Sequence, residues 1–205
     1  MTEPRLSKRL SAAARGSALP AGALERFAER ATGEGLADVA YTHHDTPVGE
    51  LLLAATPRGV VRISYLDWFP EDDTLADLAR RVSPRVLEAP ARLDEVRREL
   101  DEYFDGERRR FDLKVDRALL GPFARKVLGR TARIPYGKVS TYSEVAAAAG
   151  SPRASRAAGN ALARNPIPIV IPCHRVLRTG GGMGGYAGGL DRKARLLALE
   201  GAIED

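Results

Sequence analysis

The stretch TYSEVAAAAGSPRASRAAGNALARNP, residues 141–166, constrains the fold most, because its start and stop signals leave the backbone little freedom. Thr141 and Glu144 fit the capping-box pattern, which predicts a helix beginning after Thr141. Gly150 is suited to end that helix. Ser151 and Pro152 predict an N-cap and a first-turn proline for a second helix, which ends near residue 164. Two short helices joined by a tight turn predict a helix-turn-helix.

One face of the second helix suits DNA. At about 100° per residue, its polar side chains gather in a narrow stripe, opposite the apolar ones. Ala157 and Gly159 beside the stripe are small, so the helix backbone can approach a phosphate chain. A solvated helix face with no ligand is the alternative for such a pattern. The stripe consists of Arg153, Arg156, Asn160 and Arg164.

The charge distribution also favours a nucleic acid partner. Residues 119–205 contain 13 Lys and Arg against 5 Asp and Glu, a net charge of +8. Residues 1–118 contain 19 against 22, a net charge of −3, and the two add to the +5 of the chain. A basic half beside a mildly acidic one is typical of nucleic-acid binding, and a plain solvated surface is the alternative.

The second helix is predicted to end at Asn165, because a residue before proline avoids the helical region. The apolar run PIPIVI, 166–171, is then predicted to be extended and buried, and it leads to Cys173. This is the only cysteine, which excludes an internal disulfide and a multi-cysteine zinc site. A free thiol is mostly protonated at neutral pH, so a nucleophilic role requires a nearby base or cation.

The residues after Cys173 offer such groups. His174 follows directly, and in an extended chain it is predicted to reach the sulfur through a water. The segment GGGMGGYAGG, 180–189, contains seven glycines and lets the backbone approach a ligand closely. It lacks the Lys-Ser/Thr pair of a phosphate-binding loop. A last helix is predicted from Asp191, and Glu200 near its end is a candidate to orient His174.

The sequence of the N-terminal part indicates two regions. Residues 1–37 are Ala-rich and charged and are interpreted as an extension without an assigned role. Residues 38–118 show strands separated by turns at TPVG and TPRG, then an amphipathic charged helix ending near Gly106. With the helical residues 119–205, this predicts an α+β protein of two domains. No signal-peptide core or run of about 18 apolar residues is present, so we expect a cytoplasmic protein without a membrane partner.

Together these motifs resemble the O6-alkylguanine-DNA alkyltransferase, or methylated-DNA–protein-cysteine methyltransferase, family. The resemblance runs from about Phe123 to Gly201, through PYGKVSTYSEVA, ASRAAGNALARNPIPIVIPCHRV, GYAGG and RKARLLALEG, and more loosely through TPVGELLLAAT and FDL. It implies a ribonuclease-H-like N-terminal α/β domain and a mostly helical domain with the helix-turn-helix. It also implies a single-turnover DNA repair reaction. O6-alkylguanine is flipped from duplex DNA, bound through the minor groove, and its alkyl group moves to the protein's own cysteine.

The resemblance implies roles for individual residues. Cys173 would accept the alkyl group, and His174 and Glu200 would activate it. Tyr142 would assist extrusion and hydrogen-bond the flipped base. Arg156 would fill the space that the base leaves in the stack.

Further roles follow from the same resemblance. Asn165 would be the hinge between the recognition helix and the cysteine segment. No metal or cofactor is expected. The protein would be a monomer in solution, with cooperative binding to DNA left open, and O4-alkylthymine is a second candidate lesion. Main-chain groups of Cys173, Val176 and Ala187 would read the guanine edge. The implied pocket is formed by Val176, Tyr186, Ala187, Pro168 and Leu162.

Three other hypotheses are open at this point. An alkyltransferase-like protein would bind the lesion without efficient transfer, and Cys173 argues against it. A Cys-His hydrolase would need His174 to contact the thiol directly and would not need an Arg-striped helix-turn-helix. A transcription regulator would leave the cysteine segment and the glycine-rich loop without a purpose.

Overall fold

A four-stranded sheet forms the centre of the N-terminal half. The computed structural model describes residue 30 and residues 34–204, so the predicted extension 1–37 lies almost entirely outside the described residues. The strand order is β3-β2-β1-β4; β1, β2 and β3 are antiparallel, and β4 is parallel to β1. The turns before β2 and β3 fall at the predicted TPVG and TPRG segments. The strands are β1 (Val39–His44), β2 (Leu51–Thr56), β3 (Gly59–Tyr65) and β4 (Val86–Glu88).

Alternate residues of β2 pack into different layers, as the two-residue period of a strand requires. Leu52 and Ala54 share a cluster with Leu78 of α3. Leu51 and Leu53 face α4 and the helical half. The strand is therefore buried along its whole length. The helical elements of this half are α3 (Glu71–Arg81), the 3-10 turn η1 (Pro90–Leu93) and α4 (Asp94–Phe104).

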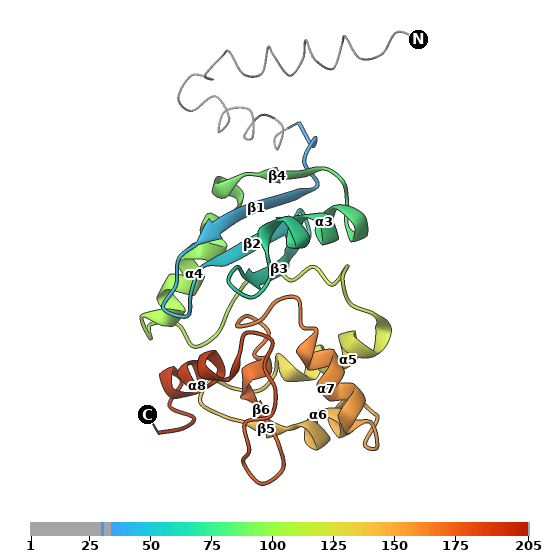
Figure 1. Ribbon diagram of the computed structural model, residues 1–205, viewed down its shortest axis with the longest axis vertical. Coiled ribbons are helices and arrows are strands. Elements are labelled where there is room, and N and C mark those ends of the chain that lie inside the picture. Colours follow the sequence, from blue (N-terminus) through green and yellow to red (C-terminus); the bar gives the residue numbers. More distant parts are fainter. Residues whose placement is uncertain (1–29, 31–33, 205) are drawn as a thin grey trace.

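Helices dominate the described part of the C-terminal half, which Figure 1 shows below the sheet, after the connection 105–121. Two very short strands, β5 and β6, pair in parallel within it. The expected α+β organisation is thus confirmed. The elements are α5 (Pro122–Thr131), β5 (Ser140–Thr141), α6 (Tyr142–Ala148), α7 (Ser155–Ala163), η2 (Cys173–Arg175), β6 (Val176–Leu177) and α8 (Leu190–Leu199).

The predicted helix-turn-helix forms from α6 and α7, with one correction. The Thr141 side chain accepts a hydrogen bond from the Glu144 N–H (3.2 Å), and the Glu144 carboxylate accepts one from the Thr141 N–H (2.8 Å), so the capping box is present. Gly150 has a φ of 83°, which favours glycine. However, α7 begins at Ser155 and Ser151 does not cap it. Residues 151–154 instead close a separate turn, in which the Ala154 N–H donates to the Ser151 carbonyl (2.9 Å).

The segment 166–171 is mostly buried, as predicted, but the expectation that it is extended is wrong. Ile169 has a φ of 72°, which β-branched residues rarely adopt. The Val170 N–H donates to the Pro168 carbonyl, and the Ile171 N–H donates to the Ile167 carbonyl, both at 2.9 Å. These turns coil the segment, bury Ile167 and Ile169 completely, and place the next residues inside the helical half.

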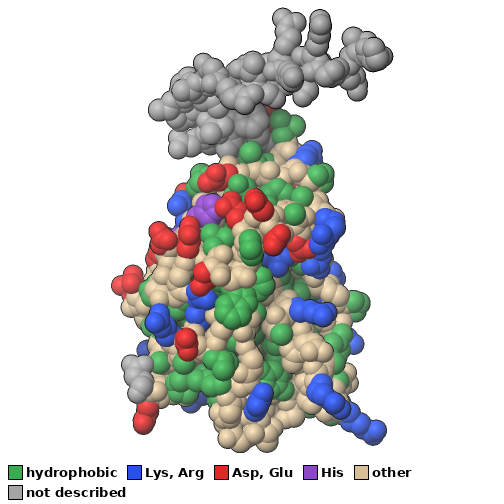
Figure 2. All heavy atoms as spheres, viewed as in Figure 1, with side chains coloured by type: hydrophobic (Ala, Val, Ile, Leu, Met, Phe, Trp, Pro, Cys, Tyr) green, Lys and Arg blue, Asp and Glu red, His purple; other side chains and the backbone are tan. Residues whose placement is uncertain are grey.

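The two halves share one hydrophobic core. Leu53 and Leu100 of the sheet half belong to the same buried cluster as Val127, Ile169 and Leu196 of the helical half. On the face shown in Figure 2, acidic side chains gather over the upper, sheet half, whereas the lower half carries mainly Lys and Arg. Within the described ranges, we find no helix with both the length and the apolar character needed to cross a membrane.

Candidate active site

Cys173 lies at the start of η2, with a residual exposure of 6%. The Asn165 side chain organises the chain before it. Its Nδ2 donates to Cys173 Sγ (3.2 Å) and to the Ile171 carbonyl (2.8 Å), and its Oδ1 accepts from the Ile167 N–H (3.1 Å). Asn165 therefore fixes both the coil and the sulfur. Residues 165–175 are called the active-site segment below.

Burial raises the pKa of the Cys173 thiol to about 11, although the Asn165 hydrogen bond and the positive charge of Lys193 act in the opposite direction. The sulfur is therefore protonated at neutral pH in the DNA-free protein. A nucleophilic role requires a base to take its proton when a substrate is bound.

His174, the predicted base, is hydrogen-bonded to Glu200. His174 is completely buried, and its Nε2 lies 2.9 Å from Glu200 Oε1. Burial lowers the pKa of His174 below its usual value, although Glu200 opposes this shift, so the ring is neutral at neutral pH. An ionised carboxylate only accepts hydrogen bonds, so the proton of the neutral ring is on Nε2. Nδ1 then has a free lone pair, and it has no hydrogen-bond partner among the described residues.

Glu200 stays ionised because several donors surround it. Burial alone would raise the pKa of its carboxyl group, but hydrogen bonds from His174, Arg175 and Tyr103 lower that pKa to about 2. Arg175 contributes Nε to Oε2 (2.7 Å) and a terminal nitrogen to Oε1 (2.8 Å), and the Tyr103 hydroxyl donates to Oε1 (2.6 Å). Because His174 is neutral, the negative charge of the Glu200 carboxylate is balanced by the guanidinium of Arg175.

Lys193 is a second buried cation of the site. It is completely buried on α8, and its Nζ donates to the Val176 carbonyl (2.6 Å) and to the Met183 carbonyl. Burial lowers the pKa of Lys193 to about 8, against the opposing effect of Cys173, so it is still mainly charged at neutral pH. Its charge favours the thiolate form of Cys173.

A cavity of about 520 Å³ opens in front of Cys173. We call it the thiol cavity. Tyr142, at the first turn of α6, spans from α7 to the glycine-rich loop and donates to the Gly185 carbonyl (3.3 Å). A Cβ on Gly184 would lie 2.5 Å from the Tyr142 hydroxyl, so only glycine permits this approach. The lining residues include Tyr142, Arg156, Leu162, Cys173, Tyr186 and Ala187.

The predicted DNA-facing helix has the expected sidedness. Ala158 and Leu162 of α7 are buried. Three of the residues predicted to contact DNA lie on the opposite, exposed face, whereas Arg153 is exposed in the turn before α7, and Arg156 also reaches the rim of the thiol cavity. These exposed residues are Arg153, Arg156, Ala157 and Asn160.

Two of the pocket residues implied by the resemblance do not line the thiol cavity. Pro168 lines a neighbouring cavity together with Asn165 and Ala187. Val176 is completely buried, its N–H donates to the Cys173 carbonyl, and its own carbonyl accepts from Lys193.

Sequence reasoning did not predict the contacts of four side chains behind the site. Tyr103 and Arg175 hold Glu200, and Tyr65 meets the Tyr186 hydroxyl at 2.8 Å. Lys193 is the fourth, and a signal for it existed, because it shares the buried i, i+3, i+4, i+7 stripe of α8 with Leu196, Leu197 and Glu200. A search of the described residues for three or more clustered His, Cys, Asp or Glu that could hold a metal finds none.

The fold and the site define a class of protein, a two-part α+β protein in which a buried cysteine and histidine lie beside a helix-turn-helix. Two family models identify it further. The 6-O-methylguanine DNA methyltransferase ribonuclease-like domain matches residues 39–117, and the DNA binding domain of the same family matches residues 122–202. The chain belongs to the 6-O-methylguanine DNA methyltransferase family.

Individual relatives agree. The constitutive methylated-DNA–protein-cysteine methyltransferase of Bacillus subtilis is 39% identical over 163 residues, covering 78% of this chain and 94% of its own. That of Methanosarcina acetivorans is 38% identical over 163 residues, covering 79% and 98%.

Solved structures give the same result. The Mycobacterium tuberculosis O6-methylguanine methyltransferase matches with a TM-score of 0.69 and 34% identity, covering 82% of this chain and 96% of that one. The M. tuberculosis OGT structure in complex with DNA also matches with a TM-score of 0.69 and 34% identity, covering 80% and 93%. The protein is thus a DNA-binding repair enzyme that transfers an alkyl group to its own cysteine.

Proposed function

We propose that Cys173 accepts the alkyl group of an O6-alkylguanine that has been flipped out of duplex DNA. The observation that carries this proposal is that the chain's only cysteine opens onto a cavity with Arg156 of the helix-turn-helix at its rim. The alkyl carbon is out of reach inside a duplex, so the base must leave the stack, which costs a few kcal/mol. Arg156 offsets this cost by occupying the vacated space.

The transfer is a direct displacement at the alkyl carbon. The sulfur–carbon bond forms as the O6–carbon bond breaks, and the bonding electron pair goes to the guanine. The thiol proton passes through a water to the free Nδ1 of His174. The Nε2–H of the ring remains hydrogen-bonded to Glu200 throughout. His174 then releases this proton, and the guanine takes up one proton at N1, so the thiol proton is balanced by the proton on the leaving guanine. Tyr142 hydrogen-bonds the flipped base, and a main-chain N–H of the glycine-rich loop stabilises the charge that develops on O6.

The remaining residues bind and orient the DNA. Arg153, Ala157 and Asn160 contact the minor groove and its phosphates, and Asn165 is the hinge that connects this helix to the thiol. Main-chain groups of Cys173, Val176 and Ala187 read the guanine edge. Walls of the base pocket are formed by Leu162, Tyr186 and Ala187, supported from behind by Pro168 and Val176.

The proposal extends to the setting of the reaction. The protein works as a monomer in the cytoplasm, where reducing conditions keep the thiol free. Residues 38–118 and 119–205 are its two domains, and no cofactor takes part. O4-alkylthymine is a second candidate lesion. A lesion-binding protein without transfer is not favoured, because the acceptor thiol is present with its base.

The test is a titration with duplex DNA carrying labelled O6-methylguanine, followed by peptide mass mapping. Label should plateau at about one equivalent per active protein, on Cys173, because a thioether has no good leaving group. Cys173→Ala should bind the duplex and take up no label. The alkylated protein should melt lower, because extra carbon in a packed site costs about 1–3 kcal/mol. Repeated turnover, or label on the Cys173→Ala variant, would contradict the proposal.

A further inference from the structure

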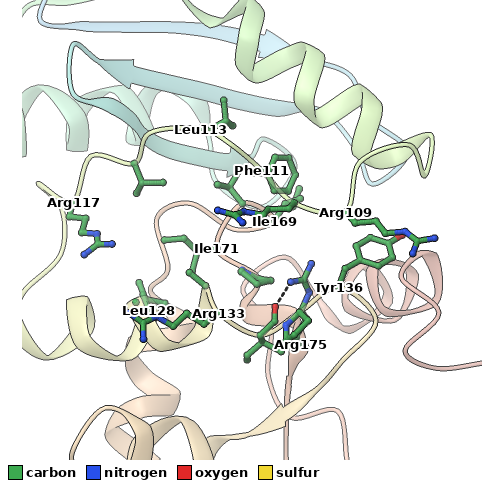
Figure 3. Close-up of a pocket in the computed structure, with 18 of the residues that line it drawn as sticks. Arg109, Phe111, Leu113, Arg117, Leu128, Arg133, Tyr136, Ile169, Ile171 and Arg175 are labelled. Carbon is green, nitrogen blue, oxygen red and sulfur yellow. Dashed lines mark hydrogen bonds between the residues drawn. The ribbon is translucent and has the colours of Figure 1, made fainter.

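A second and larger cavity lies on the opposite face of the active-site segment, and alkyl transfer does not use it. Its volume is about 740 Å³, and none of its lining residues also lines the thiol cavity. Figure 3 shows it between the connection 109–117 and the end of α5, with Ile169 and Ile171 of the active-site segment inside it. We call it the basic cleft.

The basic cleft has an uncompensated positive charge. No Asp or Glu is among its lining residues. The carboxylates around the cleft are already paired, Glu200 with Arg175, Glu99 and Asp112 with Arg108, and Asp116 with Arg58. Like charges around a concave surface raise its potential and attract an anion. Arg175 is neutralised by Glu200, so the positive charge comes from the other lining arginines, which have no acidic partner among the described residues: Arg109, Arg110, Arg117, Arg125 and Arg133.

One wall of the cleft has a free main-chain edge. Around Val115, the chain pairs with β3 through Val60, whose N–H donates to the Lys114 carbonyl (2.9 Å) and whose carbonyl accepts from the Asp116 N–H (2.8 Å). Main-chain groups of alternate residues in an extended chain point to opposite edges. The N–H and carbonyl groups of Phe111 and Leu113 therefore point away from β3, and within the described residues they have no hydrogen-bond partner.

The interior of the cleft is mainly aliphatic, and its two aromatic rings already have partners. The Phe111 ring packs on Tyr103, with centroids 5.3 Å apart. The guanidinium groups of Arg109 and Arg175 each lie 5.8 Å from the centre of the Tyr136 ring. A single-stranded nucleic acid would need free aromatic faces on which its bases could stack. An extended peptide instead uses a free main-chain edge and apolar pockets.

We propose that the basic cleft binds an extended acidic segment of a partner protein. Its Asp or Glu carboxylates pair with the exposed guanidinium groups of Arg109, Arg117 and Arg133. Its main chain bonds to the edge at Phe111 and Leu113, and its alternate apolar side chains rest on the aliphatic interior. Since the thiol cavity has separate walls, the partner and a damaged duplex can bind at the same time.

The probe is a short fluorescent peptide in which Asp alternates with Leu, followed by anisotropy on the full chain. The Arg117→Glu, Arg133→Glu double variant should bind it at least about tenfold more weakly, because two close charge pairs become repulsive. Arg130→Glu is the matched control, because Arg130 is exposed on α5, three residues before Arg133, but does not line the cleft. A peptide with Asn in place of Asp, and a labelled oligothymidylate of equal length, complete the set.

The proposal is supported if the Asp peptide binds the unmodified protein and Arg130→Glu, and if the double variant binds it at least about tenfold more weakly. Thermal melting verifies that each variant is folded. An excess of unlabelled duplex should not displace the peptide. Absence of binding to the unmodified protein would overturn the proposal, and so would an equal loss in Arg130→Glu. Tighter binding of the oligothymidylate, lost in the double variant, would make the cleft a nucleic acid site. None of these outcomes depends on alkyl transfer.

Discussion

The two halves of the protein contribute to the thiol site in different ways. Every lining residue of the thiol cavity comes from the helical half, between Tyr142 and Ala187. From the described sheet half, two phenols reach the site from behind. Tyr103 donates to Glu200, and Tyr65 bonds to Tyr186. The helical half thus contains the proposed reacting groups, and the sheet half contacts two residues beside them, Glu200 and Tyr186.

The largest effect is expected for Glu200→Gln, which acts within the helical half. The change leaves Arg175 as a buried charge without its carboxylate, and loss of one partner of a buried pair costs about 3–5 kcal/mol. His174 also loses the anion that stabilises its protonated form, so transfer to Cys173 should slow by about 100-fold or more. Urea unfolding and single-turnover transfer measure the two effects.

Glu204→Gln is the control, because Glu204 is exposed near the same end of the chain. It should match the unmodified protein in both assays. If Glu200→Gln also matches the unmodified protein in both assays, the carboxylate has no role in the site. The helical half would then not contain the groups that control transfer.

Acid stability reports on the same carboxylate. Its pKa is about 2 in the folded protein against an ordinary value of 4.5, so the unfolded state binds its proton first. The resulting stabilisation is complete above about pH 4.5 and is lost as the pH falls toward 2. The free energy of unfolding of Glu200→Gln should therefore fall less steeply between these pH values. Parallel curves for the two proteins would show that Glu200 titrates normally.

Arg156→Ala tests the DNA-facing side of the helical half. Transfer from duplex DNA should slow by about 10- to 100-fold, because the variant cannot offset the cost of extruding the base. Reaction with free O6-benzylguanine should be unchanged, because no base is extruded. Equal losses on the two substrates would make Arg156 structural. Arg153→Ala is the comparison, and it should mainly flatten the salt dependence of DNA binding.

Tyr103→Phe tests the sheet half. It removes one hydrogen bond to the ionised Glu200, which should lower the free energy of unfolding by about 1–2 kcal/mol. Transfer should slow by less than about tenfold, because His174 and Arg175 still hold the carboxylate. Tyr41→Phe removes a hydroxyl from the same half that forms no hydrogen bond with the described residues, and it should be neutral. A loss of transfer as large as in Glu200→Gln would place Tyr103 in the chemistry itself.

The smallest effect is expected for Tyr65→Phe. Its hydroxyl meets Tyr186 at 2.8 Å, and loss of one neutral hydrogen bond lowers stability by about 0.5–1.5 kcal/mol. Transfer from duplex DNA should stay within about twofold of the unmodified rate, because the Tyr186 ring keeps its contacts. Thermal melting and single-turnover kinetics measure both. A change in transfer without a change in stability would show that the sheet half shapes the thiol cavity directly.

The sequence predicted the parts of the site that depend on local signals. Thr141, Glu144 and Gly150 specify the capping box and the turn through their own side chains and backbone freedom, whatever the rest of the chain does. The start of α7 and the coil before Cys173 were not predictable in this way. A proline and an apolar run fit several backbone conformations, and packing of Ile167 and Ile169 in the core selected one of them.

The tertiary structure alone decided which groups hold the reacting residues and what lies behind them. Tyr103 is 97 residues from Glu200, and Tyr65 is 121 residues from Tyr186, so no local pattern relates the partners. The basic cleft likewise joins arginines of the connection with Arg125 of α5, Arg133 after it, and Arg175 of the active-site segment. The sequence by itself determined the helix-turn-helix, the single thiol and its neighbouring base, because short-range chemistry specifies them. The side chains that hold them in place come from both halves, and they meet only because the two halves bury one common core.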